Sequence, residues 1–362
     1  MLSIYIKTYG CAANYDDSAL LAGLLKKNGY KLTNNASSSD IIIINSCVVK
    51  DRTYAREFYE IKKIKEDFPN KKLVIAGCMA ESESKKLKKL FPDALLVSPQ
   101  HITDIINVLK ENTDALGKRR ESKLGLPKII TKTPTVQIAY GCNSYCTFCE
   151  TKLAKGPLVS FQENDIINEI KNYIKNGYKR INLTSTDNGC YGMDIKTSLP
   201  NLLKKIIKPK GDFKIRVGMM NPEHVKKFLN ELIEIYKSRN IIKFLHIPVQ
   251  SGSNKVLKDM NRKYTVQEFK KIVTEFRKNI PNLTISTDII LGYPTETKKD
   301  FQQTINLIKQ IKPEVLNISK FSPRPGTKTA KLKLLPTQEV KRRSVITTKI
   351  FNKIRKSRKC FI

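Results

Sequence analysis

The sequence has no tryptophan and only three histidines, and its 33 acidic residues face 67 basic ones. No apolar run approaches the roughly 20 residues that a helix needs to cross a membrane, and the N-terminus lacks the pattern of a secretory signal. These absences predict a cytoplasmic protein without a membrane partner, in a compartment where thiols stay reduced. The eight cysteines are therefore expected to bind metal rather than to form disulfides.

The excess of basic residues gives a formal net charge of +34. Ion-pair networks of a thermostable protein would raise both signs together, but here only one sign is raised. A polyanionic partner, most simply nucleic acid, is the physical interpretation. The alternative is compositional, because coding in an AT-rich genome favours Lys, Ile and Asn, and the basic surface would then have no ligand.

Three cysteines stand close together in the middle of the chain, with the spacing C-x₃-C-x₂-C: Cys142, Cys146 and Cys149. Three thiolates at this spacing can bind three irons of a four-iron, four-sulfur cluster, which a fourth cysteine would normally complete. The next cysteine, Cys190, is some forty residues further on. One iron would thus stay open, and an open metal position is where chemistry occurs.

A zinc site is the competing interpretation of this cysteine loop. Zinc takes four ligands, usually as two C-x₂-C pairs or as one pair with histidines. The uneven spacing and the aromatic residues Tyr145 and Phe148, which could flank an adenine, favour the iron–sulfur cluster. None of the histidines is near the loop in sequence: His101, His224 and His246.

The segment 1–112 consists of a repeated unit of one strand and one helix. Alternation at this spacing predicts a Rossmann-like α/β domain with a parallel sheet. The expected strands cover residues 2–9, 40–45 and 72–76, and the expected helices cover 16–25, 54–65 and 81–90.

Each of these strands is followed by a cysteine that precedes a helix: Cys11, Cys47 and Cys78. The strand-to-helix loops of a parallel sheet lie along one edge, so the three side chains can converge. Helix N-termini also favour the thiolate. One such cysteine would be interpreted as a buried structural residue, but three at equivalent places predict a second iron–sulfur site.

After a polar linker at 113–134, a second domain is expected at 135–330. Six strand–helix units are too few for a closed eight-stranded barrel and predict a partial (βα)₆ barrel, with its site at the C-terminal ends of the strands. The basic tail, 331–362, contains one acid, Glu339, and is either a solvated helix or a surface along an RNA backbone. The six expected strands are 136–140, 180–185, 214–219, 243–249, 284–291 and 315–321.

Over nearly its whole length, the chain resembles the radical S-adenosylmethionine (SAM) methylthiotransferases of the archaeal and eukaryotic tRNA type. The cysteine loop matches the radical-SAM motif of that family. The other matching segments are 8–18, 45–49, 76–79, 216–224, 246–253 and 287–296.

The resemblance implies transfer of a methylthio group to C2 of N6-threonylcarbamoyladenosine at position 37 of tRNA. It also implies two iron–sulfur clusters, expected to be 4Fe–4S, with SAM as both methyl donor and radical source, and an electron donor protein as partner. No side chain is assigned as a catalytic acid or base, because none can ionise the C2–H bond at neutral pH, and the cofactors carry the hard step. SAM is expected across the barrel's strand ends, near Phe148, Ser185, Asp187, Arg216, Gln250 and Gly292.

Two departures from the family pattern leave alternatives open. Family members usually end in a small RNA-binding β-barrel called TRAM, which we expect to be absent because the chain stops about where it would begin. Lys155 stands where the family usually has arginine, which keeps the charge but loses the planar fork. A methylthiotransferase acting on a ribosomal protein side chain and a non-catalytic iron–sulfur RNA-binding protein are the alternatives, and the sequence does not indicate an oligomeric state.

Overall fold

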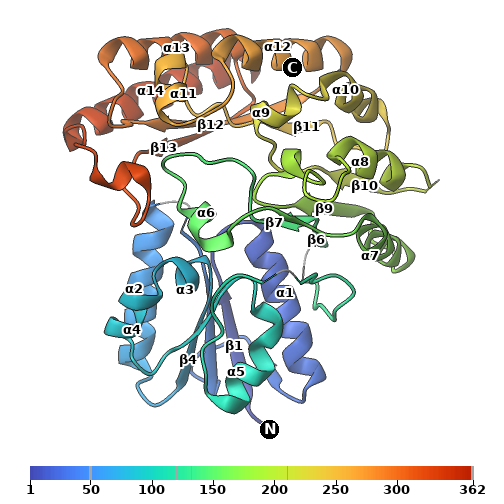
Figure 1. Cartoon of the computed structure of the whole chain (residues 1–362), viewed down its shortest axis with the longest axis vertical. Helices are drawn as coiled ribbons and strands as arrows, with labels where there is room; N and C mark the ends of the chain where they lie inside the picture. The colour runs from blue at the N-terminus through green and yellow to red at the C-terminus, as the bar shows by residue number, and fades with distance from the viewer. Residues whose placement is uncertain (49–50, 120, 132, 210, 360–362) are drawn as a thin grey trace. The chain divides into compact units, whose positions relative to one another are not determined.

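The computed structural model describes the chain except residues 49–50, 120, 132, 210 and 360–362. Packing divides it into two units (Figure 1). The first comprises residues 1–142 and 150–186, and the second comprises 143–149 and 187–362. No helix among the described residues is long and apolar enough to span a membrane.

A five-stranded parallel sheet forms the centre of the first unit, with the strand order β2-β1-β3-β4-β5. The three predicted strands of this region are β1, β3 and β4, so the prediction of a parallel α/β domain is confirmed. The strands are β1 (Ser3–Thr8), β2 (Lys31–Thr33), β3 (Ile41–Ser46), β4 (Lys72–Gly77) and β5 (Leu95–Val97).

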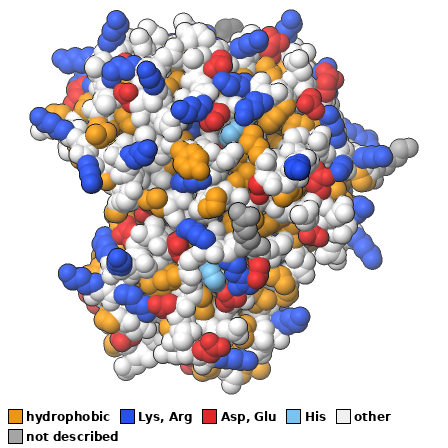
Figure 2. All heavy atoms as spheres, in the orientation of Figure 1, with side chains coloured by type: hydrophobic (Ala, Val, Ile, Leu, Met, Phe, Trp, Pro, Cys, Tyr) orange, Lys and Arg blue, Asp and Glu red, His pale blue; other side chains and the backbone are white. Residues whose placement is uncertain are grey.

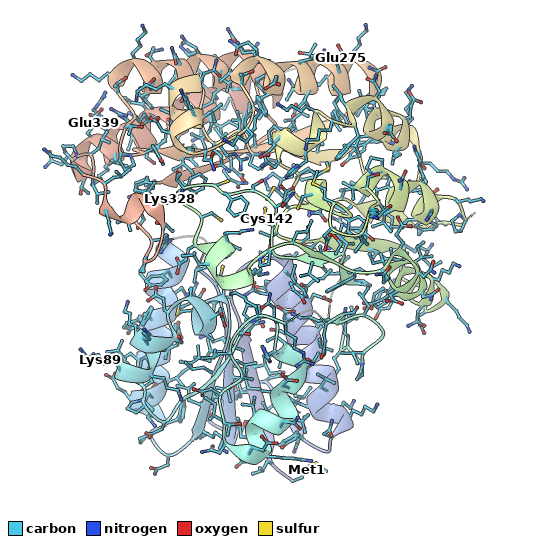
Figure 3. All side chains as sticks on the ribbon, viewed as in Figure 1. Met1, Lys89, Cys142, Glu275, Lys328 and Glu339 are labelled. Carbon is cyan, nitrogen blue, oxygen red and sulfur yellow. The ribbon has the colours of Figure 1, made fainter. Side chains whose placement is uncertain are left out.

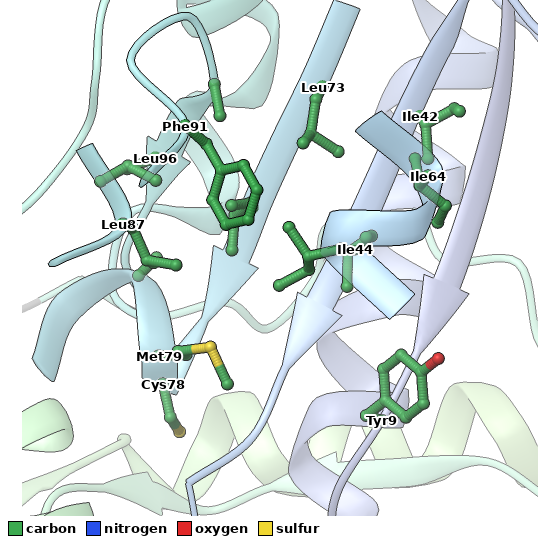
Figure 4. Packing of buried hydrophobic residues seen from close by; sticks show 14 of the residues in the cluster. Tyr9, Ile42, Ile44, Ile64, Leu73, Cys78, Met79, Leu87, Phe91 and Leu96 are labelled. Atoms are coloured by element: carbon green, nitrogen blue, oxygen red, sulfur yellow. The ribbon is translucent and has the colours of Figure 1, made fainter. Parts of the chain in front are cut away.

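The central strand β3 is buried on both faces, as is typical of a parallel sheet covered by helices. Because side chains alternate along a strand, Ile41 and Ile43 pack in the core on one face, with residues of α1 and α5. Ile42 and Ile44 pack in the core on the other face, with residues of α2 and α4 (Figure 4). The helices are α1 (Ala12–Lys27), α2 (Asp51–Asp67), α3 (Cys78–Ser82), α4 (Ser84–Leu90), η1 (Ile102–Asp104) and α5 (Ile105–Glu111).

The segment predicted to be a linker is fixed to the first unit by buried ion pairs. The ammonium of Lys123 lies 2.7 Å from a carboxylate oxygen of Asp17. That of Lys128 lies 3.0 Å from Asp16 and 2.6 Å from Glu169. Strand β6 pairs in parallel with β9, and β7 pairs with β8 antiparallel. These elements are β6 (Thr135–Gln137), β7 (Ala139–Tyr140), α6 (Glu150–Lys155), β8 (Val159–Ser160), α7 (Glu163–Lys175) and β9 (Arg180–Thr184).

The second unit contains the parallel sheet β11-β12-β13 and the strand β10. With β6–β7 and β9, these strands account for all six that the sequence predicts. The unit's strands are β10 (Lys214–Arg216), β11 (Phe244–His246), β12 (Thr284–Leu291) and β13 (Val315–Lys320).

Helices of the second unit begin where the sequence offers capping residues. Thr265 and Glu268 form a capping box at the start of α12, and Thr297 and Asp300 form another at α13. The helices are η2 (Asn188–Cys190), α8 (Leu199–Ile207), α9 (Pro222–Val225), α10 (Leu229–Lys237), α11 (Asn254–Asp259), α12 (Val266–Asn279), α13 (Lys298–Ile311), η3 (Lys328–Lys331) and α14 (Thr337–Lys359).

Candidate cofactor sites

Cys11, Cys47 and Cys78 lie at one edge of the first sheet. Ser46 and Gly77 are register partners on β3 and β4, so the cysteines that follow them leave the sheet side by side. Cys11 is the residue before α1 and follows the end of β1. Figure 4 shows Cys78 beyond the arrowheads of the strands. The topology therefore brings the three cysteines to the same edge of the sheet, and their role as cluster ligands stays a prediction.

Glycine allows the close approach between two of these loops. Gly10 has a φ of 104°, and a Cβ added there would lie 2.9 Å from the sulfur of Cys47. The Asn14 amide donates a hydrogen bond to the carbonyl of Ser46 over 2.7 Å, which joins α1 to the end of β3. The thiol of Cys11 lies 3.3 Å from the Asn14 side-chain oxygen. The cysteines are thus positioned by backbone contacts as well as by topology.

The three sulfurs differ in exposure. Cys47 and Cys78 are 3% and 2% exposed, while Cys11 is open to solvent. Burial raises the pKa of Cys78, and the positive charge of Lys155 opposes that rise. Two enclosed sulfurs and one accessible sulfur suit a group larger than a single ion that must be reached by a substrate. The donor set fits an iron–sulfur cluster, whose ligands are thiolates.

Two charged residues near this set were not assigned to it by sequence reasoning. Lys155, at the end of α6, is 4% exposed, and although burial lowers its pKa, the sulfurs of Cys78 and Cys11 raise it above the usual value. Glu57 of α2 accepts a hydrogen bond from the backbone N–H of Cys47 over 2.7 Å. Burial raises the pKa of Glu57 to about 8. In the sequence, Glu57 looks like a solvated charge, and Lys155 stands out only because it occupies the place of the family's usual arginine.

Cys142 follows β7 in the first unit (Figure 3). Gly141, just before it, has a φ of 69°, and a Cβ there would collide with the carbonyl of Pro157. The backbone N–H of Cys142 donates to the carbonyl of Gly156 over 3.3 Å. The glycine-dependent turn at the strand end thus sets where the cysteine loop begins.

Cys146 and Cys149 belong to the second unit, where the N–H of Cys149 donates to the carbonyl of Cys146 over 3.2 Å. A guanidinium nitrogen of the buried Arg262 lies 3.2 Å from the sulfur of Cys146. Arg262 is itself held by the hydroxyl of Tyr264, 3.0 Å away. A positive charge beside this sulfur favours the thiolate that a metal requires. Sequence reasoning missed Arg262, which is more than a hundred residues away along the chain.

The predicted SAM contacts have different environments. The hydroxyl of Ser185, after β9, is buried and has no hydrogen-bond partner in the described part of the chain. Asp187 instead accepts hydrogen bonds from the N–H groups of Gly189 and Asn221, at 2.9 and 3.0 Å. Burial raises the pKa of Asp187 to about 6. The buried hydroxyl of Ser185 is suited to bind a ligand because it has no partner in the described part of the chain. The carboxylate of Asp187 is less suited, because it already accepts two hydrogen bonds from backbone N–H groups.

Three further predicted contacts lie in the second unit. The guanidinium of Arg216 lies 4.5 Å from the ring centre of Phe244. Phe148 packs against Val256, Met260 and Tyr293. Gln250 has a φ of 69°, and its backbone bridges to β12. Their contact with SAM stays a prediction.

Gly292, the last predicted SAM contact, has a φ of 76°. Its N–H donates to Glu296 over 2.9 Å, and a Cβ added there would lie 2.5 Å from a methyl of Val340 on α14. The turn and the approach of α14 account for the glycine without a ligand. Its role in binding SAM likewise stays a prediction.

A polar row crosses the sheet of the second unit. A carboxylate oxygen of Asp288 on β12 lies 3.1 Å from Nε2 of His246 on β11. The amide of Asn317 on β13 donates to Asp288 over 2.6 Å. All three side chains are half-buried, so they can meet a polar ligand. Asp288 belongs to the family-matching segment 287–296, whereas no signal in the sequence pointed to Asn317.

Family comparison agrees with this arrangement. Residues 3–98 match the model of the uncharacterized protein family UPF0004, and residues 136–308 match the radical SAM superfamily. The chain is 41% identical over 358 residues to a probable threonylcarbamoyladenosine tRNA methylthiotransferase of Pyrococcus horikoshii, covering 97% of this chain and 84% of that protein. It is 38% identical over 368 residues to the threonylcarbamoyladenosine tRNA methylthiotransferase of Homo sapiens, covering 96% of this chain and 62% of that protein.

These matches define a protein with a radical SAM domain after an N-terminal UPF0004 domain. The chain belongs to the family of threonylcarbamoyladenosine tRNA methylthiotransferases.

Solved structures share the fold. The radical SAM methyltransferase TsrM from Kitasatospora setae, with cobalamin and a [4Fe-4S] cluster bound, superposes with a TM-score of 0.66 at 12% identity. That alignment covers 91% of this chain and 77% of TsrM. The cobalamin-dependent radical enzyme OxsB gives a TM-score of 0.62 at 11% identity, covering 98% of this chain and 56% of OxsB. At these identities, the likeness concerns the fold alone.

Proposed function

We propose that this chain is an enzyme that transfers a methylthio group to C2 of N6-threonylcarbamoyladenosine at position 37 of tRNA. The observation that carries the proposal is the convergence of Cys11, Cys47 and Cys78 at one sheet edge, in a chain that also has the radical-SAM cysteine loop. A protein that only cleaves SAM has no need for the first set. Membership of the methylthiotransferase family agrees with both sets.

Six cysteines would hold two 4Fe–4S clusters, one on each set, with Cys142, Cys146 and Cys149 forming the SAM-cleaving set. When bound, the clusters and SAM supply the radical, the methyl group and the sulfur. The chain's own residues position them: Arg262 sets a positive charge beside Cys146, and Lys155 sets one near Cys78. Phe148, Ser185, Asp187, Arg216, Gln250 and Gly292 remain the proposed contacts of SAM.

The substrate and the cellular context follow from charge and chemistry. A net charge of +34 suits tRNA, and Figure 2 shows lysine and arginine side chains projecting along much of the drawn outline. Reductive cleavage of SAM needs an electron donor protein, and a tRNA-modifying enzyme with reduced thiols belongs in the cytoplasm. We also propose the domain division 1–112, 113–134, 135–330 and 331–362.

The test is anaerobic incubation of reconstituted protein with SAM, a reductant and threonylcarbamoylated tRNA, followed by mass analysis of the nucleosides. We expect the 2-methylthio nucleoside together with 5′-deoxyadenosine. The triple variant Cys11→Ala, Cys47→Ala, Cys78→Ala should still release 5′-deoxyadenosine but form no methylthio product. Release without product from the unaltered protein would favour a ribosomal protein substrate, and no release at all would favour a non-catalytic protein.

A further inference from the structure

Helix α14 (Thr337–Lys359) is anchored along one side within the second unit. Val340, Thr347 and Phe351 are buried on that side. Arg343, which is 2% exposed, lies 2.5 Å from a carboxylate oxygen of Glu296 and 2.8 Å from one of Glu339. The turn at Gly292 lets Val340 approach closely. These contacts fix the rotation of α14 about its axis, so the side of the helix opposite the buried residues faces away from the core of the second unit.

That opposite side carries a row of basic side chains, which we name the basic stripe. At 3.6 residues per turn, its members fall on one face, away from the buried residues. At about 1.5 Å per residue, the stripe is roughly 21 Å long. It consists of the exposed residues Arg342, Lys349, Lys353 and Lys356.

Among the described residues, the lysines of the basic stripe lack the acidic partners found on other exposed helices. On α2, Lys62 pairs with Glu66 one turn away. On α14 the single acid is Glu339 in the first turn, labelled in Figure 3, and it binds both Arg342 and Arg343. No Asp or Glu follows it in the sequence. The later lysines of the stripe thus have no acid of their own helix beside them.

This charge pattern opposes helix stability unless an anion is present. Like charges four residues apart, such as Lys349 and Lys353, destabilise a helix by a few tenths of a kcal/mol per pair. A solvated helix gains from interspersed acids, as α2 does. A row of phosphates would remove the repulsion and release its own counterions. Charge complementarity therefore favours RNA over an uncharged or basic partner.

We propose that the basic stripe of α14 binds the phosphate backbone of the tRNA substrate. The identity of the RNA rests on the proposed function, whereas the surface is assigned by burial and charge. Lysine ammoniums act as point charges on phosphate and carry no base information, so the stripe positions tRNA without selecting its sequence.

The test compares two triple variants of equal net charge. Lys349→Gln, Lys353→Gln, Lys356→Gln removes three of the four members of the stripe. Lys27→Gln, Lys85→Gln, Lys89→Gln removes three exposed lysines of the first unit and serves as the matched control. Binding of a tRNA transcript is measured by fluorescence anisotropy over a series of KCl concentrations. Iron content and thermal unfolding verify that both variants are folded.

We expect the stripe variant to lower the slope of log K against log salt by about 2 to 3, because each lost phosphate contact removes about 0.7 to 0.9. Affinity at ~0.1 M salt should fall roughly a hundredfold, equally for unrelated tRNAs. The control should keep the unaltered slope, and Lys→Arg at the three stripe positions should restore it. Equal losses in both Gln variants, or none in the stripe variant, would overturn the proposal.

The binding experiment can fail independently of the activity experiment that tests the proposed function. If the unaltered protein forms the methylthio nucleoside but the stripe variant binds tRNA like the control, the surface assignment fails alone. If the unaltered protein forms no such nucleoside yet its RNA binding depends on the stripe, the substrate assignment fails alone.

Discussion

Lys155 and Cys78 interact electrostatically inside the first unit, where both side chains are almost completely buried. Helix α6, which ends at Lys155, packs on α3: Ala154 belongs to the same core cluster as Cys78, and Glu150 accepts a hydrogen bond from Ser82 over 3.0 Å. Within the described part of the chain, the Lys155 ammonium forms no ion pair with a carboxylate. The groups that raise its pKa against the effect of burial are Cys78 and Cys11, followed by Asp17 and Cys47. Its counter-charge is therefore the sulfur set together with Asp17.

This relationship predicts that Lys155 tunes the cluster that we propose for Cys11, Cys47 and Cys78. Lys155→Met removes a positive charge that favours the reduced, more negative cluster. One of the two cluster potentials should fall by about 59 mV, a tenfold change in a one-electron equilibrium. Potentiometric EPR measures it, with iron content unchanged. Lys155→Arg should retain the original value, and so should Lys171→Met on the exposed face of α7. An unchanged potential in Lys155→Met would show that the ammonium does not act on this cluster.

Gly10 offers a second test of the same site, with Gly29 as its control. Both have positive φ values, 104° and 84°, so alanine costs about 1 kcal/mol of backbone strain at either position. Only at Gly10 would the new Cβ press on Cys47, at 2.7 Å from its Cβ, whereas Gly29 has open space. Gly10→Ala should therefore lower iron content by about half, from about eight to about four per chain, while Gly29→Ala keeps it. Equal iron content in both variants would mean that the Cys47 loop can shift to accommodate the new Cβ at position 10 without losing the cluster.

The sequence predicts most strands and both cysteine sets because these depend on local patterns. β-branched runs such as Ile41–Ile44 indicate buried strands, and a topological rule then brings the following cysteines together. Apolar residues over 223–238 recur as in one continuous helix, and the prediction of such a helix is wrong, because α9 ends at Val225 and α10 begins at Leu229. The backbone leaves the helical region at Phe228, and the periodicity of apolar residues does not reveal such a break.

The charged residues of the sites were less predictable. Arg262 and Glu57 are buried beside cysteine loops, yet nothing in their local sequence separates them from solvated charges. Lys155 was singled out only because it stands where the family usually has arginine. Arg343 lies in a basic run that suggests exposure and is nonetheless buried against Glu296. Contacts over such sequence separations are set by tertiary packing, which periodicity and spacing do not encode.

The anchoring of α14 can be tested through two neighbouring arginines. Arg343→Met leaves the fully buried Glu296 without its partner, and breaking a buried pair in this way costs about 3–5 kcal/mol. Arg342→Met removes an exposed partner of Glu339, which should cost less than about 1 kcal/mol. Anaerobic denaturant unfolding measures both free energies. Similar small losses would show that the buried pair does not hold the helix.

His224 is expected to stay neutral well below its usual pKa. Its imidazole is 2% exposed, and burial lowers its pKa to about 4, with Lys227 and Arg262 adding to the effect and Glu223 opposing it. Asp187 also faces it, with 3.5 Å between a carboxylate oxygen and Nε2. In NMR, the His224 ring signals should show no inflection between about pH 5.5 and 8. An inflection near pH 6.5 would contradict the burial argument.

The depressed pKa of His224 has a defined consequence for stability. In the unfolded chain, histidine takes up a proton near pH 6.5, whereas in the folded protein it does so only near pH 4. Between these values, the unfolded state binds more protons, so acid removes up to about 1.4 kcal/mol of stability per pH unit. Asp187, whose pKa is raised to about 6, acts with the opposite sign. Comparison with His224→Gln, which retains Asp187, isolates the histidine. The unfolding free energy of the unaltered protein should fall relative to that of the variant from about pH 6.5 towards 4, and parallel profiles would exclude a neutral buried imidazole.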